Sequence, residues 1–157
     1  MKTGSPRRRE DAKEDQMYGE TMPAEVERIA AAVVDSAYKV HLKFGPGLLE
    51  SVYEACLARE LRRRGFFVER QVPVPIIYEG EELDEAFRID IRVNRLVVVE
   101  VKAVEAMLPV FAAQAKTYLK LTGHPLALLI NFNVPLIKEG IRRIVLTENL
   151  KQQLNLP

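Results

Sequence analysis

Three strand-like segments follow one another within residues 66–103, and the connections between them are only a few residues long. The segments are 66–78, 82–93 and 96–103, and the connections are "EGEE" and Asn94-Arg95, both turn-like in composition. Parallel strands need a crossover of a dozen or more residues, so segments joined this closely favour an antiparallel meander. Pro73 and Pro75 place part of the first strand at an edge or in an irregular stretch, because proline cannot donate to a ladder.

Apolar residues at helical spacing precede and follow the meander. The predicted helices are 23–44, 48–65 and 108–122. The predicted later strands are 125–133 and 141–146, followed by a C-terminal helical turn. Because a helix separates the meander from strand 125–133, that strand can join the sheet by a crossover. The sequence therefore predicts an α/β fold with a mixed central sheet flanked by helices.

Bulk composition indicates one folded unit preceded by a charged tail. The chain has 157 residues, of which 48% are hydrophobic, enough for a core. Residues 1–22 hold few large apolar side chains, so we expect a disordered tail there and a single domain over 23–157. The 23 basic and 22 acidic residues argue against a polybasic binder, although a local patch can still bind nucleic acid.

Cysteine count and hydropathy bear on the compartment. A single cysteine, Cys56, excludes a disulfide within the chain and a cysteine zinc cluster, and it fits a reducing cytosol. The N-terminus is polar and no apolar run approaches membrane length, so we see no secretory signal or membrane span. We expect a cytoplasmic protein that does not bind membranes.

Charged residues interrupt the most apolar strand. Glu100 and Lys102 are two residues apart in "LVVVEVKAVE", so they share one face and lie about 7 Å apart along the strand. In the preceding strand, apolar residues alternate with charged ones, which predicts one apolar face and an opposite face that carries Asp90. The apolar set is Phe87, Ile89, Ile91 and Val93.

The length of the second turn decides whether Asp90 meets Glu100. Directly paired residues of a ladder project to the same face. A three-residue connection, Asn94 to Leu96, pairs Asp90 with Glu100, whereas a strict two-residue turn places them on opposite faces unless a bulge intervenes. Both registers are compatible with the sequence.

If the carboxylates of Asp90 and Glu100 converge, a divalent cation would relieve their repulsion. Oxygen ligands without cysteine or histidine favour Mg²⁺ or Mn²⁺ over zinc. Lys102 beside the ion would orient a water nucleophile or stabilise charge on a phosphate, as metal-assisted phosphodiester hydrolysis requires. The alternative is that Glu100 and Lys102 form a half-exposed ion pair worth about 0–1 kcal/mol.

Five segments resemble one family in the same order along the chain. They are "GPGLLESVYE", which contains Gly47-x-x-Glu50-x-x-Tyr53, "RIDIRV", "VVEVKAVE", "AQAKTYLKLTG" and "LLINFNVPLIKEGIRRIV". Together they resemble the GxxExxY protein family of the PD-(D/E)XK nuclease-like superfamily over about residues 24–146. The resemblance implies a restriction-endonuclease-like αβββαβ core and metal-dependent nuclease chemistry on DNA or RNA.

The resemblance also implies roles for particular residues. It assigns the superfamily aspartate to Asp90 and the (D/E)XK motif to Glu100 and Lys102. The helical glutamate corresponds to Glu50 and a glutamine of many relatives to Gln114. The implied metal ligands are Asp90, Glu100 and Glu50, with Mg²⁺ or Mn²⁺ as the ion. The residue before the aspartate is isoleucine instead of proline, which leaves the ligand intact.

Other interpretations of these residues stay open on the sequence alone. Glu50 begins a helix, where its carboxylate would either reach the site or make local hydrogen bonds. Tyr53 would pack in the core with its hydroxyl at the rim of the site. The alternative to a nuclease is a catalytically silent module that binds nucleic acid or a protein, or a domain that acts only within a complex.

Overall fold

The structure is a computed structural model that describes residues 22–146. The predicted tail lies outside this range except for Met22, and so does the predicted C-terminal helical turn. The helices are α2 (Ala24–Phe44), α3 (Glu50–Arg63) and α4 (Pro109–Thr122), with a short 3-10 helix, η1 (Ile137–Gly140). The strands are β1 (Val68–Tyr78), β2 (Glu81–Val93), β3 (Val97–Lys102), β4 (Leu126–Asn131) and β5 (Ile141–Val145).

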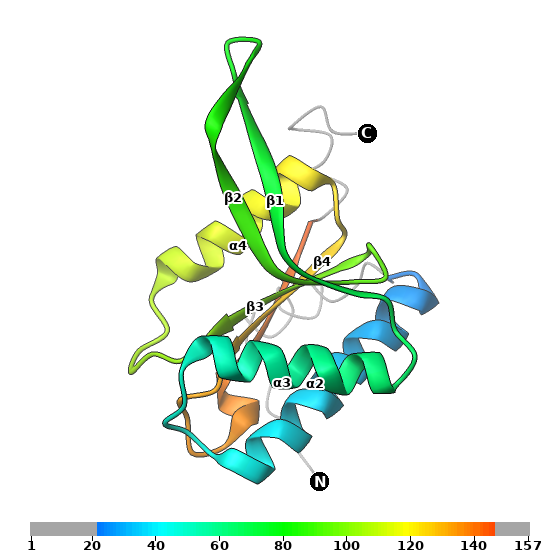
Figure 1. The fold of residues 1–157 in the computed structure, drawn as a ribbon, viewed down its shortest axis with the longest axis vertical. Coiled ribbons are helices and arrows are strands. Elements are labelled where there is room, and N and C mark those ends of the chain that lie inside the picture. The colour runs from blue at the N-terminus through cyan, green and yellow to red at the C-terminus, as the bar shows by residue number, and fades with distance from the viewer. Residues whose placement is uncertain (1–21, 147–157) are drawn as a thin grey trace, which may run out of the picture.

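The strands form one sheet in the order β1-β2-β3-β4-β5 (Figure 1). β1, β2 and β3 pair antiparallel, β4 runs parallel to β3, and β5 is antiparallel to β4. The predicted meander, the helical crossover and the mixed sheet are therefore confirmed. The strand that carries Pro73 and Pro75 lies at an edge of the sheet, as expected, because its free side needs no donors.

Helices cover both faces of this sheet, α2 and α3 on one side and α4 on the other (Figure 1). The α2–α3 side buries Val97, Val99 and Val101 of β3. The α4 side buries Val98 of β3 together with residues of β4. Because strand residues alternate between faces, Glu100 follows Val98 toward α4, where 5% of its surface is exposed.

The predicted single apolar face of residues 87–93 is wrong. Phe87 and Ile89 pack on the α4 side, whereas Ile91 and Val93 pack beneath α2 and α3. The apolar pattern changes face at Asp90, and the residue opposite, Gln71 of β1, has φ 52°, so we infer a kink in the β1–β2 hairpin there. This long hairpin projects beyond the rest of the sheet (Figure 1). Simple alternation failed because it assumes an unkinked strand.

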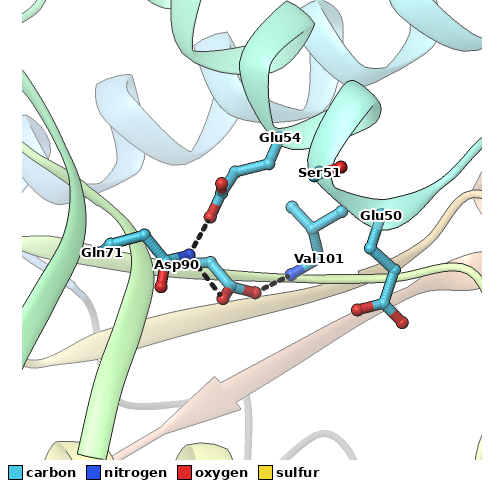
Figure 2. A pocket seen from close by; sticks show the side chains of 6 residues that line it. All are labelled: Glu50, Ser51, Glu54, Gln71, Asp90 and Val101. Atoms are coloured by element: carbon cyan, nitrogen blue, oxygen red, sulfur yellow. Dashed lines mark hydrogen bonds between the residues drawn. The ribbon is translucent and has the colours of Figure 1, made fainter.

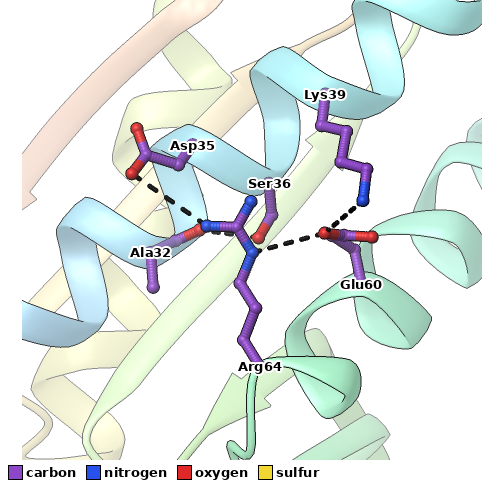
Figure 3. Close-up of polar contacts among 6 residues, drawn as sticks. All are labelled: Ala32, Asp35, Ser36, Lys39, Glu60 and Arg64. Atoms are coloured by element: carbon purple, nitrogen blue, oxygen red, sulfur yellow. Dashed lines mark hydrogen bonds and ion pairs between the residues drawn. The ribbon is translucent and has the colours of Figure 1, made fainter.

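A cluster of hydrogen bonds and ion pairs joins α3 to α2 (Figure 3). The Glu60 carboxylate, which is buried, accepts hydrogen bonds from Lys39 Nζ at 3.0 Å and from Arg64 Nε at 3.3 Å. Arg64 also approaches Asp35 of α2, 4.0 Å away. This cluster helps to set the position of α3, which carries Glu50 at its other end.

Within residues 22–146, no helix combines the length and the apolar character that crossing a bilayer requires.

Candidate functional site

The connection between β2 and β3 has three residues, Asn94, Arg95 and Leu96. Asn94 and Arg95 both adopt left-handed backbone angles, φ 49° and φ 56°, and the Leu96 N–H donates to the Val93 carbonyl at 3.0 Å. The strands then pair Val93 with Val97 and continue in that register as far as Ile91 and Val99. The next positions in this register are Asp90 and Glu100, so the turn length brings the two carboxyl groups together.

At Asp90 and Glu100, hydrogen bonds from backbone N–H groups to carboxyl side chains replace the backbone-to-backbone bonds of the β2–β3 ladder. The Val101 N–H donates to Asp90 Oδ2 at 2.9 Å, and the Asp90 N–H donates to Glu100 Oε1 at 3.3 Å. Each carboxyl group therefore occupies a place where a regular ladder would have a backbone carbonyl. The site forms where β2 and β3 separate.

Burial and mutual repulsion disfavour two negative charges at this pair. Burial raises the pKa of Glu100 to about 9, with the Asp90 charge as the second cause. Burial also raises the pKa of Asp90, although the hydrogen bond from Val101 opposes this rise. At neutral pH the Glu100 carboxyl is thus protonated unless a positive ion joins it.

Lys102 provides positive charge beside Asp90 and Glu100, but it does not form the Glu100–Lys102 ion pair that the sequence offered as an alternative. Its charge acts to lower the pKa of both Asp90 and Glu100. Its Nζ lies 4.7 Å from the centre of the Phe111 ring, over α4. Among residues 22–146, no salt bridge joins Lys102 to Glu100, so Lys102 is held by the aromatic ring and half-buried, with its ammonium group available.

Glu50 lies at the first residue of α3, near the end of β3. Its Oε1 accepts a hydrogen bond from the Ala103 N–H at 3.2 Å. From the sequence, Glu50 was expected either to reach the site or to make local hydrogen bonds. In the structure it reaches the end of β3 and hydrogen-bonds to the backbone there. It ties α3 to the residue that follows Lys102.

Tyr53 is fully buried and its hydroxyl organises the loop before α3. The ring stacks on Phe132 with centroids 4.5 Å apart. The hydroxyl donates to the Gly45 carbonyl at 2.5 Å and accepts from the Leu48 N–H at 3.1 Å. Within the Gly47-x-x-Glu50-x-x-Tyr53 motif, the tyrosine therefore holds the loop that delivers Glu50.

A pocket of about 240 Å³ opens between α3, β1 and the separating strands (Figure 2). Its lining residues are Glu50, Ser51, Glu54, Gln71, Asp90 and Val101. Figure 2 shows Glu54 pointing toward Gln71 and Asp90, with Glu50 at the other end of the pocket. Asp90 thus faces both this pocket and the buried Glu100.

Glu54 and Gln71 were not among the residues singled out from the sequence. Glu54 follows Glu50 by four residues, and this spacing places both carboxylates on one side of the helix. That signal was present in the sequence and went unused. Gln71 carried no comparable signal, because its position depends on the hairpin kink.

Gln114 lies exposed on α4, and within residues 22–146 no hydrogen bond joins it to the other predicted site residues. One turn later, Tyr118 is buried against the edge of Phe87, with ring centroids 5.3 Å apart. Burial raises the pKa of Tyr118, and the charges of Glu100 and Asp90 raise it further. Tyr118 of α4 therefore lies close enough to the carboxyl pair for their charges to raise its pKa.

The carboxyl pair suits a hard divalent cation. Within the described part of the chain, no group of three His, Cys, Asp or Glu side chains is arranged to hold a metal ion. Mg²⁺ needs fewer protein ligands, usually one or two carboxylates, because it keeps several waters and binds substrate phosphates. Asp90 and Glu100 each offer a carboxyl group, Glu100 Oε1 lies 3.3 Å from the Asp90 backbone nitrogen, and the repulsion between their charges would be relieved by such an ion.

Comparison with protein-family models gives a match that covers most of the described chain. A family model described as the PD-(D/E)XK nuclease superfamily matches residues 27–144. No curated protein and no solved structure gave a significant match. The match covers every described helix except the first turn of α2 and every described strand except the last residue of β5.

Proposed function

Because this chain belongs to the PD-(D/E)XK nuclease superfamily, we propose that it is a metal-dependent nuclease that hydrolyses phosphodiester bonds of DNA or RNA. The observation that carries the proposal is the placement of the Glu100 carboxyl group against Asp90, where it accepts a hydrogen bond from the Asp90 N–H and the two negative charges repel each other, with the Lys102 charge beside them. Families of this fold can share a scaffold without sharing activity, so the proposed activity depends on these three side chains.

Asp90 and Glu100 would hold Mg²⁺ or Mn²⁺. When bound, such an ion polarises a phosphoryl oxygen and lowers the pKa of a coordinated water. Asp90 is oriented for this task by the Val101 N–H. Glu50, the third ligand that the resemblance implies, lines the same pocket as Asp90 but belongs to no three-ligand group within residues 22–146, so we propose that it holds water molecules around the ion.

Lys102 would place positive charge where negative charge develops on the phosphate. Its ammonium group makes no salt bridge to the carboxyl pair, so it remains available for a phosphate or for the attacking water. The Phe111 ring limits the directions that the long side chain can take. Gln114 is exposed on α4 and makes no hydrogen bond to this group within residues 22–146. We therefore propose for Gln114 only a contact with the substrate.

Exposed arginines on α3 support a nucleic-acid substrate. Arg59, Arg62 and Arg63 line an open hollow of about 520 Å³ on the same helix that carries Glu50. Guanidinium groups bind phosphates through several hydrogen bonds at once. A local basic surface of this kind compensates for the net charge of only +1.

One observation favours a second candidate, a nuclease-like module that binds nucleic acid without cutting it. It is the lack, within residues 22–146, of a group of three potential metal ligands. Both candidates predict nucleic-acid binding, but only the first predicts cleavage that requires a divalent ion.

The test is cleavage of labelled DNA and RNA by the purified protein in Mg²⁺, Mn²⁺ or EDTA. We expect cleavage with either ion and none in EDTA. Lys102→Ala should reduce the rate by about 100-fold or more, because it removes charge stabilisation of the transition state. Lys43→Ala, which removes an exposed lysine of α2, is the matched control and should cleave normally.

Unchanged cleavage by Lys102→Ala would identify a contaminating nuclease. Binding without cleavage by the wild-type protein, with both ions, would favour the second candidate.

A further inference from the structure

Glu54 carries a buried negative charge that the proposed chemistry does not use. Only 5% of its surface is exposed, although it is a glutamate in the second turn of α3. It accepts hydrogen bonds from Arg70 Nη2 at 2.7 Å and from Gln71 Nε2 at 2.6 Å. Burying a carboxylate is costly unless it is paired and hydrogen-bonded, and Arg70 and Gln71 together meet that requirement.

Gln71 has a strained backbone in the middle of an edge strand. Its φ is 52°, in the left-handed region that residues with a Cβ avoid. The ladder pairs Arg70 with Ile91 and Val72 with Ile89, so Gln71 lies opposite Asp90. The strain therefore occurs at the kink that places Asp90 in the pocket, and strain of this kind is found at functional sites.

The amide of Gln71 connects the two acids. Its Nε2 has two hydrogens, and it donates at 2.6 Å to Glu54 Oε1 and more weakly, at 3.4 Å, to Asp90 Oδ1. An ionised carboxylate only accepts hydrogen bonds, so Glu54 turns the NH₂ group, and not the carbonyl, toward Asp90. Figure 2 shows the Gln71 amide between the carboxyl groups of Glu54 and Asp90.

We infer that Glu54 and Gln71 are positioning residues that hold the Asp90 carboxylate in its metal-binding orientation. Gln71 contacts one oxygen of Asp90, the Val101 N–H contacts the other, and Glu54 fixes the amide of Gln71. The inference rests on the proposed function, because it presumes that Asp90 holds an ion. Groups that orient a metal ligand in this way typically contribute about 10–100-fold to metal affinity or activity.

The structure offers a variant that removes the amide without harming the backbone. Gln71→Gly deletes the side chain and relieves the left-handed strain, since glycine adopts positive φ freely. Glu79 at the tip of the same hairpin also has φ 52°, so Glu79→Gly is the matched control for a backbone change alone. Glu54→Ala leaves Arg70 unpaired but partly exposed to water, and Glu54→Gln keeps an acceptor oxygen as the conservative replacement.

The experiment measures Mn²⁺ affinity of the metal-free full chain by calorimetry, and then kcat and KM for cleavage of an oligonucleotide. Gln71→Gly and Glu54→Ala should each weaken Mn²⁺ binding by about 10-fold or more and lower kcat with little change in KM. Glu79→Gly should match the wild type, and Glu54→Gln should recover most of the loss. The double variant Glu54→Ala/Gln71→Gly should be no worse than Gln71→Gly alone, because Glu54 acts through Gln71.

Wild-type Mn²⁺ affinity in Gln71→Gly would overturn the inference, as would losses that add in the double variant. If the wild-type protein binds Mn²⁺ but cuts neither DNA nor RNA, the proposed function fails while the affinity measurements still decide the inference. If it binds no Mn²⁺ at all, Asp90 has no ion to hold and the inference is overturned.

Discussion

Tyr53 shows how one residue can serve a site without entering it. Its ring packs on Phe132 and its hydroxyl bonds the backbone on both sides of Gly47, whose φ of 110° suits glycine. These contacts fix the loop immediately before α3. Glu50 is therefore the first residue of the helix and lies next to the end of β3. The spacing of glycine, glutamate and tyrosine in this motif is thus explained by loop geometry.

Glu100 should make the metal-free protein sensitive to alkaline pH. Its folded pKa of about 9 lies far above the value of about 4.3 expected in an unfolded chain. The folded state therefore holds a proton that the unfolded state has lost, and the contribution of Glu100 to stability falls as pH rises from about 5 to 9. The slope can approach about 1.4 kcal/mol per pH unit for one such group.

Urea denaturation in EDTA at pH 5, 7 and 9 measures this effect. The wild-type protein should lose stability relative to Glu100→Gln as pH rises, because glutamine resembles the protonated carboxyl and does not titrate. Added Mg²⁺ should stabilise the wild type more at high pH, where binding displaces fewer protons. Parallel pH profiles of the two proteins would contradict the buried, protonated state of Glu100.

At the level of elements, a polar contact with α2 contributes to the position of α3. Lys39 lowers the pKa of Glu60 below its ordinary value through their hydrogen bond, and Arg64 contributes further. A carboxylate with a depressed folded pKa stabilises the fold above its unfolded pKa and loses this contribution as pH falls. The cluster in Figure 3 therefore supports α3 at neutral pH and weakens in acid.

Glu60→Ala tests this contribution. The variant should be less stable than the wild type at pH 7, and the difference between the two should shrink as pH falls below about 4 and the wild-type carboxylate is protonated. Thermal unfolding at pH 7, 5 and 3 provides the measurement, with Glu82→Ala on the exposed hairpin as control. A difference that stays constant with pH would show that Glu60 acts through packing alone.

Across the whole molecule, charges are segregated although the net charge is nearly zero. The tip of the β1–β2 hairpin carries acidic residues and no basic ones between Gln71 and Phe87, whereas α3 presents an arginine surface. The acidic residues are Glu79, Glu81, Glu82, Asp84 and Glu85. Nucleic acid is expected to approach the arginines and to avoid the hairpin tip.

Removing two of these arginines should weaken nucleic-acid binding in a salt-dependent way. Arg59→Ala/Arg63→Ala should bind a labelled oligonucleotide more weakly, and the slope of log affinity against log salt should fall by about 1.4–1.8 in magnitude. Lys43→Ala/Lys138→Ala removes equal charge elsewhere and should bind like the wild type. Fluorescence anisotropy from 50 to 200 mM salt measures both, and equal slopes for both double variants would exclude the arginine hollow as a phosphate contact.

Local patterns in the sequence were sufficient for the elements and their order. Period-two and helical spacing, two short turns and one helical crossover predicted a mixed sheet, and they placed Glu100 on the face opposite Val99. These features depend on neighbours along the chain, so they can be predicted from the sequence alone. The resemblance added the identity of the carboxyl pair, which the family match supports at the level of the superfamily.

Tertiary structure alone decided the register, the kink and the contacts of Glu54, the second acid of α3. One residue more or less at Asn94–Leu96 would have separated Asp90 from Glu100, and the sequence was compatible with both. The left-handed Gln71 and the burial of Glu54 arise from contacts between α3 and β1, at sequence separations of 16 and 17 residues. Such contacts depend on how whole elements pack, so the spacing of Glu50 and Glu54 could suggest Glu54 as a candidate, but its contact with Gln71 emerged only from the structure.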